Sequence, residues 1–282
     1  MNPPEAGREV RRVGILLAAY GAAAPAGDMA LEIFTRRVRE EFPDCPARWA
    51  FTSDLLRGRL AAVGKKTDSV HKALMRMAFE RYSHVAVQSL HLVSGEEYEA
   101  LRATVDKARA GEGPERVSLG FPLLHGSEDV EEAAEALLAH LPAEREAGEP
   151  VVFVGHGGRQ EWAYAALERA AAARDGHILI GTLNRDREAE KIIERLHALC
   201  PPRSAAAGGR RVWLLPLLAL IGKHAVEDIA GENARSWRGR IEAAGFSCRV
   251  LLRGTVECDG FARIWLNHLR AALEELCRSN SR

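Results

Sequence analysis

Short apolar runs alternate with longer amphipathic stretches along the whole chain. The apolar runs predict strands at residues 13–19, 47–52, 84–90, 116–121, 150–155, 177–182, 211–218 and 248–253. The stretches between them predict helices at residues 28–42, 68–82, 97–110, 128–140, 160–174, 186–199, 232–244 and 260–278. Because strands and helices alternate, we expect an α/β fold with parallel strands joined by crossover helices.

The chain divides near its middle. The segment "LPAEREAGEP" at residues 141–150 combines proline, glycine and charge between a predicted helix and a predicted strand, which is typical of a connection between domains. We therefore predict an N-terminal α/β lobe at residues 1–143 and a C-terminal α/β lobe at residues 144–282.

The two halves resemble each other. When their first strands are aligned, Tyr20-Gly21 falls opposite His156-Gly157. Further matches follow in the same order at the ends of later strands, pairing Thr52 with Thr182, Asp54 with Asn184, and Glu97 with His224. Because matches in a shared order are typical of a duplicated unit, we predict two similar lobes, each a parallel four-stranded sheet flanked by helices.

Such folds bind ligands beyond the carboxyl ends of their parallel strands. The equivalent segments of the two lobes should therefore face one another across a cleft that gathers Tyr20, Glu97, His156 and His224. Two imidazoles and a carboxylate form a common ligand set for divalent metals. We accordingly predict that His156, His224 and Glu97 bind a metal and carry the catalysis.

Neighbouring residues are candidates for binding a flat organic ligand. Gly157 lets the backbone beside His156 approach a ligand closely, and Tyr20 with Gly21 holds the equivalent position in the other lobe. His91 interrupts the third apolar run, where it either lines the cleft or is buried in the core. The predicted ligand-binding residues are therefore Tyr20, Gly21, His91 and Gly157.

Composition narrows the choice of partners and compartment. Lys plus Arg and Asp plus Glu both number 39, so no overall positive charge favours nucleic acid or an anionic membrane. No apolar run approaches the roughly 20 residues of a membrane span.

Five dispersed cysteines are typical of a reducing compartment, and we expect the cytoplasm. The apolar run after Arg11-Arg12 resembles a secretory signal, but we predict that it is retained as a strand, because it aligns with the first strand of the second half. The chain has no glycine-rich phosphate loop, and we expect no organic cofactor.

Six segments form a pattern that covers nearly the whole chain: "AFTS" (50–53), "QSLHLVSGEEYE" (88–99), "VVFVGHGG" (151–158), "LLPLLALIGKHAVEDIAGENARSW" (214–237), "AAGF" (243–246) and "HLRAALEE" (268–275). The pattern resembles the anaerobic cobalt chelatases of cobalamin synthesis, which have the two-lobed class II chelatase fold. The resemblance implies that His156 and His224 are the metal-site histidines and that Glu97 is the acidic residue near them.

The resemblance also implies a reaction, the insertion of cobalt(II) as substrate metal into the tetrapyrrole sirohydrochlorin. A sirohydrochlorin ferrochelatase that uses iron(II) to make sirohaem stays open as an alternative, as does a carrier that binds tetrapyrrole or metal without catalysis. Because the tetrapyrrole is rich in carboxylates, cations are expected at the cleft rim, with candidates Arg57, Arg59, Lys65, Lys66 and Arg185. A homo-oligomer formed through alanine-rich helices is also open.

Three positions depart from the family pattern. The segment "AAYGA" (18–22) stands where the family has Ser-Phe-Gly-Thr, Asn184 stands where a glutamate is usual, and Lys223 replaces an acid. These exchanges make the site more positive and bear on the choice of metal more than on the fold.

Overall fold

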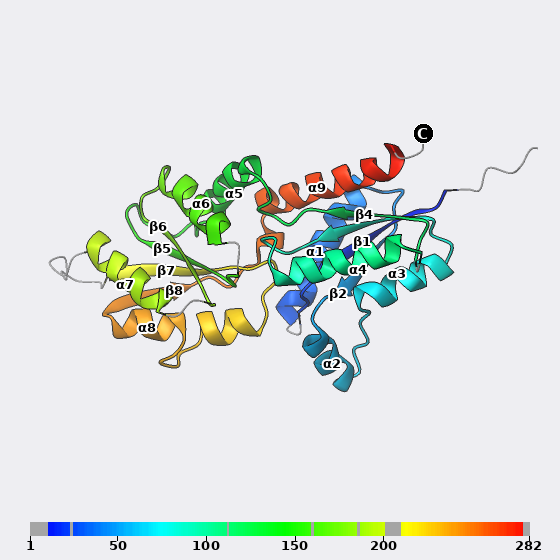
Figure 1. The fold of residues 1–282 in the computed structure, drawn as a ribbon. Helices are drawn as coiled ribbons and strands as arrows, with labels where there is room; N and C mark the ends of the chain where they lie inside the picture. The colour runs from blue at the N-terminus through cyan, green and yellow to red at the C-terminus, as the bar shows by residue number, and fades with distance from the viewer. Residues whose placement is uncertain are drawn as a thin grey trace, which may run out of the picture.

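The computed structural model describes residues 11–22, 25–111, 113–158, 161–184, 187–200 and 210–278. It contains two sheets, each with four parallel strands (Figure 1). The first sheet comprises β1 (Val13–Ala19), β2 (Ala47–Phe51), β3 (His84–Ser89) and β4 (Arg116–Gly120). The second comprises β5 (Val151–Gly155), β6 (Ile178–Thr182), β7 (Arg210–Leu217) and β8 (Phe246–Val250). The strand orders, β2-β1-β3-β4 and β6-β5-β7-β8, are equivalent, which confirms the predicted α/β fold with two similar halves.

Helices cover both faces of each sheet. They are α1 (Pro25–Glu41), α2 (Asp54–Ala62), α3 (Val70–Phe79), α4 (Glu96–Arg109), α5 (Ser127–Ala139), α6 (Glu161–Ala172), α7 (Glu188–Leu199), a π-helix (His224–Ile229), α8 (Trp237–Ala243), a 3-10 turn (Thr255–Glu257) and α9 (Asp259–Arg278). Helices α3 and α4 pack on one face of the first sheet, and α7 and α8 pack on the corresponding face of the second. Within the described residues, none of the helices is both long and apolar enough to cross a membrane.

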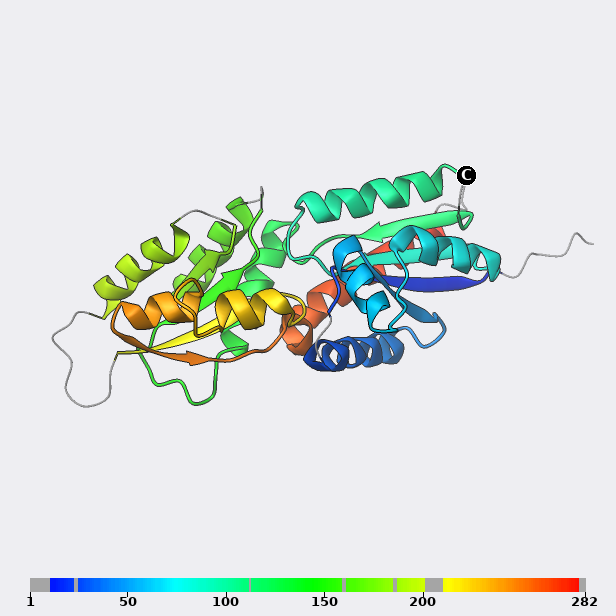
Figure 2. The same cartoon turned by 90° about the horizontal axis from the view of Figure 1, so that it is seen from below.

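Two helices were not expected from the sequence. Ser53 starts α2 by accepting a hydrogen bond from the backbone N–H of Leu56. This helix projects from the first sheet (Figure 1) and lies in front of that sheet in the view from below (Figure 2). The π-helix occupies the segment after β7 for which a loop was expected. At the end of α8, Gly245 adopts a positive φ of 86°, and β8 begins directly afterwards at Phe246, two residues earlier than predicted.

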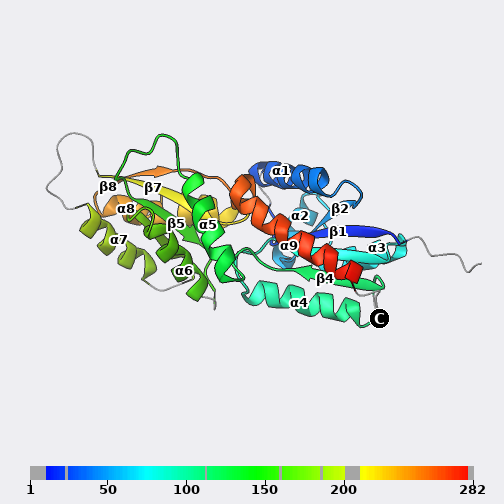
Figure 3. The same cartoon turned by 90° about the horizontal axis from the view of Figure 1, so that it is seen from above.

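The C-terminal helix α9 returns to the first half of the chain. It contacts β3 and β4 and also packs against α5 (Figure 3). Trp265 of α9 is fully buried, with its ring 6.2 Å from that of Phe34 on α1 in an edge-to-face arrangement. The core cluster that contains both rings includes residues of both sheets and of α1, α5, α6 and α9. This shared core joins the two halves.

Close backbone contact marks the crossing of α5 and α9. A Cβ atom placed on Gly260 of α9 would lie 2.7 Å from the Cβ of Ala136 on α5, well inside van der Waals contact. The crossing is therefore tight because position 260 carries no side chain.

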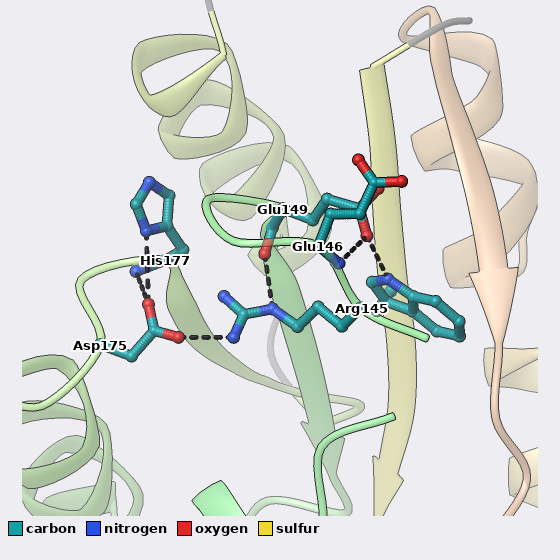
Figure 4. A network of polar contacts seen from close by, with 6 residues as sticks. Arg145, Glu146, Glu149, Asp175 and His177 are labelled. Atoms are coloured by element: carbon teal, nitrogen blue, oxygen red, sulfur yellow. Dashed lines mark hydrogen bonds and ion pairs between the residues drawn. The ribbon is translucent and has the colours of Figure 1, made fainter. Parts of the chain in front are cut away.

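The segment that precedes β5 is held by a network of polar contacts (Figure 4). Arg145 donates to the carboxylate of Asp175 at 2.6 Å and to the backbone carbonyl of Glu149 at 2.8 Å. The carboxylate of Glu149 accepts from the indole of Trp213 on β7 at 2.7 Å. Burial acts to raise the pKa of Asp175, but the hydrogen bonds from Arg145 and from the His177 backbone hold that pKa below its usual value. The network fixes this segment to the second sheet.

We expect Arg145→Ala to lower the free energy of unfolding by about 2–4 kcal/mol, because it leaves a largely buried Asp175 carboxylate without its cation. Urea unfolding of the full chain measures the change. Arg39→Ala is the control. Arg39 and Glu32 are both exposed and their charged atoms lie 3.8 Å apart, so this variant should change the free energy of unfolding by less than about 0.5 kcal/mol. Equal losses in the two variants would contradict the structural role of the network.

Candidate active site

A cavity of about 640 Å³ lies between the two halves, at the carboxyl ends of their strands. From the first half it is lined by the turn after β1, by α2 and by the segment from β3 into α4. From the second half it is lined by the turns after β5 and β6 and by the segment from β7 into the π-helix, the unlabelled yellow helix of Figure 1. The arrangement agrees with the cleft expected from the sequence repeat. All seven predicted site residues line this cavity: Tyr20, Gly21, His91, Glu97, His156, Gly157 and His224.

The structure brings His156 and His224 together. His156 directly follows β5, and His224 is the first residue of the π-helix after β7. Their ring centroids lie 5.3 Å apart with an interplanar angle of 74°. Burial, together with the charge that His224 can carry, holds the pKa of His156 below its usual value. At neutral pH the His156 imidazole is therefore uncharged, the form that binds metals.

Each of these imidazoles has a partner on its Nδ1 atom. His224 Nδ1 lies 2.6 Å from the Asp228 carboxylate, one helical turn further along the same segment. His156 Nδ1 lies 3.3 Å from the side-chain amide of Asn184, beyond the end of β6. The partners differ in charge, since one is a carboxylate and the other a neutral amide.

Glu97 approaches from the other half of the cleft, on the first turn of α4. Its carboxylate lies 3.6 Å from His91 Nε2, and the Nδ1 atom of His91 lies 2.8 Å from the hydroxyl of Ser89. Burial raises the pKa of Glu97, against the opposing effect of nearby His224. Burial also lowers the pKa of His91 to about 4, so this imidazole is neutral at neutral pH. His91 is thus both buried and part of the cleft wall.

The predicted three-residue metal site is not preformed as a compact cluster. Within the described parts of the chain, no group of three or more His, Cys, Asp or Glu side chains is arranged to hold a metal ion. His156 and His224 are a pair of adjacent imidazoles, and Glu97 contacts His91 instead. A divalent metal bound by two imidazoles alone would keep its remaining coordination positions for water or substrate.

Glycines shape both equivalent turns. Gly21 after β1 has a φ of 113°, and Gly157 after β5 has a φ of 85°, values that favour glycine. A Cβ on Gly21 would lie 2.6 Å from the Leu56 side chain of α2. A Cβ on Gly157 would lie 3.0 Å from the Cβ of Thr182. The glycines let these two turns pack closely beside the cleft.

Several cleft residues were not predicted from the sequence. Tyr164 of α6 lines the cavity from within the core, and burial raises its pKa to about 12, against a hydrogen bond from the Gly157 backbone. Asp228 was missed because the segment after His224 was not recognised as helical, although its spacing of four residues is the signal for such a contact. Leu55 and Leu56 come from the unexpected helix α2 and add apolar surface to the cavity lining.

The five cations predicted for the rim differ in their surroundings. Arg59 is exposed, and it lines the cavity from α2. Arg57 instead binds the Phe51 carbonyl and Asp54, and Lys65 pairs with Asp28 at 2.7 Å. Lys66 is exposed outside the cavity lining, and Arg185 lies outside the described residues.

Carboxylates outnumber cations in the described lining of the cleft. The cations are Arg59 and Lys223, and the carboxylates are Glu96, Glu97, Glu227 and Asp228. Lys223 pairs with Glu227 at 3.3 Å, so the lysine that departs from the family pattern is partly neutralised. The carboxylate in direct contact with one of the two histidines is that of Asp228, whereas Glu227 is paired with Lys223.

Solved structures share this architecture. The chain resembles SirB from Bacillus subtilis with Fe3+, with a TM-score of 0.61, 13% identity, and coverage of 95% of this chain and 98% of that one. It also resembles CbiX, described as the terminal enzyme for biosynthesis of siroheme in denitrifying bacteria, with a TM-score of 0.56, 17% identity, and coverage of 92% and 99%. The predicted class II chelatase fold is therefore confirmed.

Sequence comparison identifies the family. The family model for cobalt chelatase (CbiK) matches residues 13–274. The chain is 48% identical to the sirohydrochlorin cobaltochelatase CbiKC of Nitratidesulfovibrio vulgaris, over 97% of this chain and 95% of that protein. It is 32% identical to the sirohydrochlorin cobaltochelatase of Salmonella typhimurium, over 83% of this chain and 87% of that protein. The chain belongs to the cobalt chelatase (CbiK) family, and the resemblance found in its motifs is confirmed.

We expect Gly157→Ala to lower the free energy of unfolding by about 1–2 kcal/mol, because alanine disfavours a positive φ. Urea unfolding measures the change. Gly176→Ala is the matched control, since a Cβ there meets nothing within 4 Å and its φ is not in the positive region. If Gly157→Ala matched this control, the turn beside His156 would not be constrained as described.

Proposed function

We propose that this chain inserts cobalt(II) into sirohydrochlorin, with the metal as a substrate. The observation that carries the proposal is the pair of imidazoles, His156 and His224, with ring centroids 5.3 Å apart on one wall of the cleft. The names of the two curated relatives support the choice of metal and tetrapyrrole. The cavity volume of about 640 Å³ falls within the range of roughly 300–1,000 Å³ typical of cofactor-sized ligands.

The reaction requires a metal ligand and a proton acceptor. Two pyrrolic N–H protons leave as one divalent metal enters, with no change in oxidation state. His156 and His224 hold the metal at one wall of the cleft, because neutral imidazoles are good ligands for divalent transition metals. Glu97 assists from the opposite wall by balancing charge or accepting a proton. Its raised pKa makes it a better proton acceptor than an ordinary glutamate.

The macrocycle occupies the space between these walls. Tyr20 is 39% exposed and Leu55 is 63% exposed, so both offer apolar surface to a flat ring. Gly21, Gly157 and the buried His91 form the remaining predicted contacts of the cleft wall. Arg59 supplies a cation for a substrate carboxylate.

The five cysteines are all unpaired in the structure. Free thiols persist in reducing compartments, so we place the reaction in the cytoplasm.

We expect His156→Ala and His224→Ala each to lower the rate of cobalt insertion by at least about 100-fold, because each removes a direct metal ligand. The absorbance change of sirohydrochlorin on metallation, followed over many turnovers, measures the rate. Wild-type turnover in both variants would remove the histidines from the mechanism.

A spectral shift that stops at one equivalent of tetrapyrrole per wild-type chain would instead identify a carrier. Parallel reactions with iron(II) test the preference for cobalt(II), and faster insertion of iron would overturn the metal assignment.

We expect Arg59→Ala to raise the KM for sirohydrochlorin about 5- to 10-fold, because it removes a charge-assisted hydrogen bond to a substrate carboxylate. The rate at saturating tetrapyrrole should stay within about twofold, since the contact is remote from the metal. Lys66→Ala removes one positive charge outside the cavity lining and is the matched control. Equal KM values in the two variants would exclude a specific role for Arg59.

A further inference from the structure

The contact between His224 and Asp228 fixes which nitrogen of His224 is free. A carboxylate accepts hydrogen bonds, so at 2.6 Å from Asp228 Oδ2 the His224 Nδ1 atom is the donor and carries a proton. In the neutral ring the second nitrogen, Nε2, then keeps its lone pair. A histidine that gives its other N–H to a carboxylate is held in one orientation and is a more basic metal ligand.

The partner of His156 does not impose the same choice. The atom of Asn184 that faces His156 Nδ1 is the amide nitrogen Nδ2, whose N–H donates, so Nδ1 accepts and the proton of the neutral ring lies on Nε2. A turn of the uncharged amide by 180° would instead present its oxygen, which accepts from a protonated Nδ1. The contact is also longer, at 3.3 Å, and the amide carries no charge. The two adjacent imidazoles therefore differ in how firmly a hydrogen bond on Nδ1 holds Nε2 ready to bind a metal.

We propose that Asp228 is a positioning residue that makes His224 the principal ligand of incoming cobalt(II), with His156 as the second ligand. This inference rests on the proposed function, because it assumes that these imidazoles bind the metal. The position of Asp228 argues against a role in stability. Its side chain is 51% exposed, and His224 is the one hydrogen-bond partner it has among the described residues.

The chain provides a matched control for the charge of Asp228. Glu227 is the preceding residue, lines the same cavity and is similarly exposed, but it pairs with Lys223 at 3.3 Å and not with a histidine. Removing either carboxylate takes one negative charge from the cleft. Only the loss of Asp228 releases His224.

The test is titration of the full chain with cobalt(II) alone, without tetrapyrrole. We expect Asp228→Asn to weaken cobalt binding about 10- to 100-fold, as the loss of such a hydrogen-bond partner typically does. Glu227→Gln should weaken it by less than about threefold, since it removes only an exposed charge. Adding Asn184→Asp to Asp228→Asn should recover part of the affinity by giving His156 a carboxylate partner. Urea unfolding without metal should be unchanged in Asp228→Asn.

Turnover separates positioning from a general defect. Asp228→Asn should raise the KM for cobalt(II) and leave the KM for sirohydrochlorin within about twofold, because the tetrapyrrole contacts are intact. If Asp228→Asn binds cobalt(II) as tightly as Glu227→Gln does, while His224→Ala has lost binding, the role of Asp228 is refuted and the proposed function stands. If His156→Ala and His224→Ala both keep wild-type cobalt affinity and turnover, the proposed function fails as well.

Discussion

The packing of α9 against the first sheet is the contact on which the site depends. This helix follows β8 in the chain but contacts β3 and β4, and its Trp265 is fully buried in the shared core. The polypeptide therefore crosses between the halves twice, once near α5 and once before α9. With both crossings packed into one core, the carboxyl ends of the two sheets face a common cavity. Segments far apart in sequence can then act on one ligand.

The two walls of the cavity make different chemical contributions. The second half supplies the adjacent imidazoles of His156 and His224, each with a polar partner on Nδ1. The first half supplies Glu97, which is supported by the buried neutral His91, and the apolar and cationic surface of α2. A metal ion and an anionic macrocycle require opposite charges for binding. The cavity carries both signs of charge, because Asp228 lies beside His224 in one half and Arg59 lies on α2 in the other.

Most of the fold could be predicted from the sequence, because strands buried on both faces appear as continuous apolar runs. The predicted strands match the observed ones, with the largest shift of two or three residues at β8. The missed helix α2, "DLLRGRLAA", has a weak apolar period, and Gly58 in its interior argues against a helix. The convergence of His156 and His224 followed from the rule for parallel strands. The contact between Asp228 and His224 did not follow, because it depends on an unexpected π-helix. The place of Tyr164 in the cleft did not follow either, because it depends on how α6 packs.

The bare backbone of Gly260 has a consequence for the distance between the walls. Helices α5 and α9 cross where Gly260 meets Ala136, and the first sheet is carried on α9 while the second is packed against α5 through α6. A methyl group at position 260 would push α5 and α9 apart, and because these helices pack against different halves, the two halves would shift relative to each other. The spacing of the two halves therefore depends in part on a residue that lies outside the cavity lining.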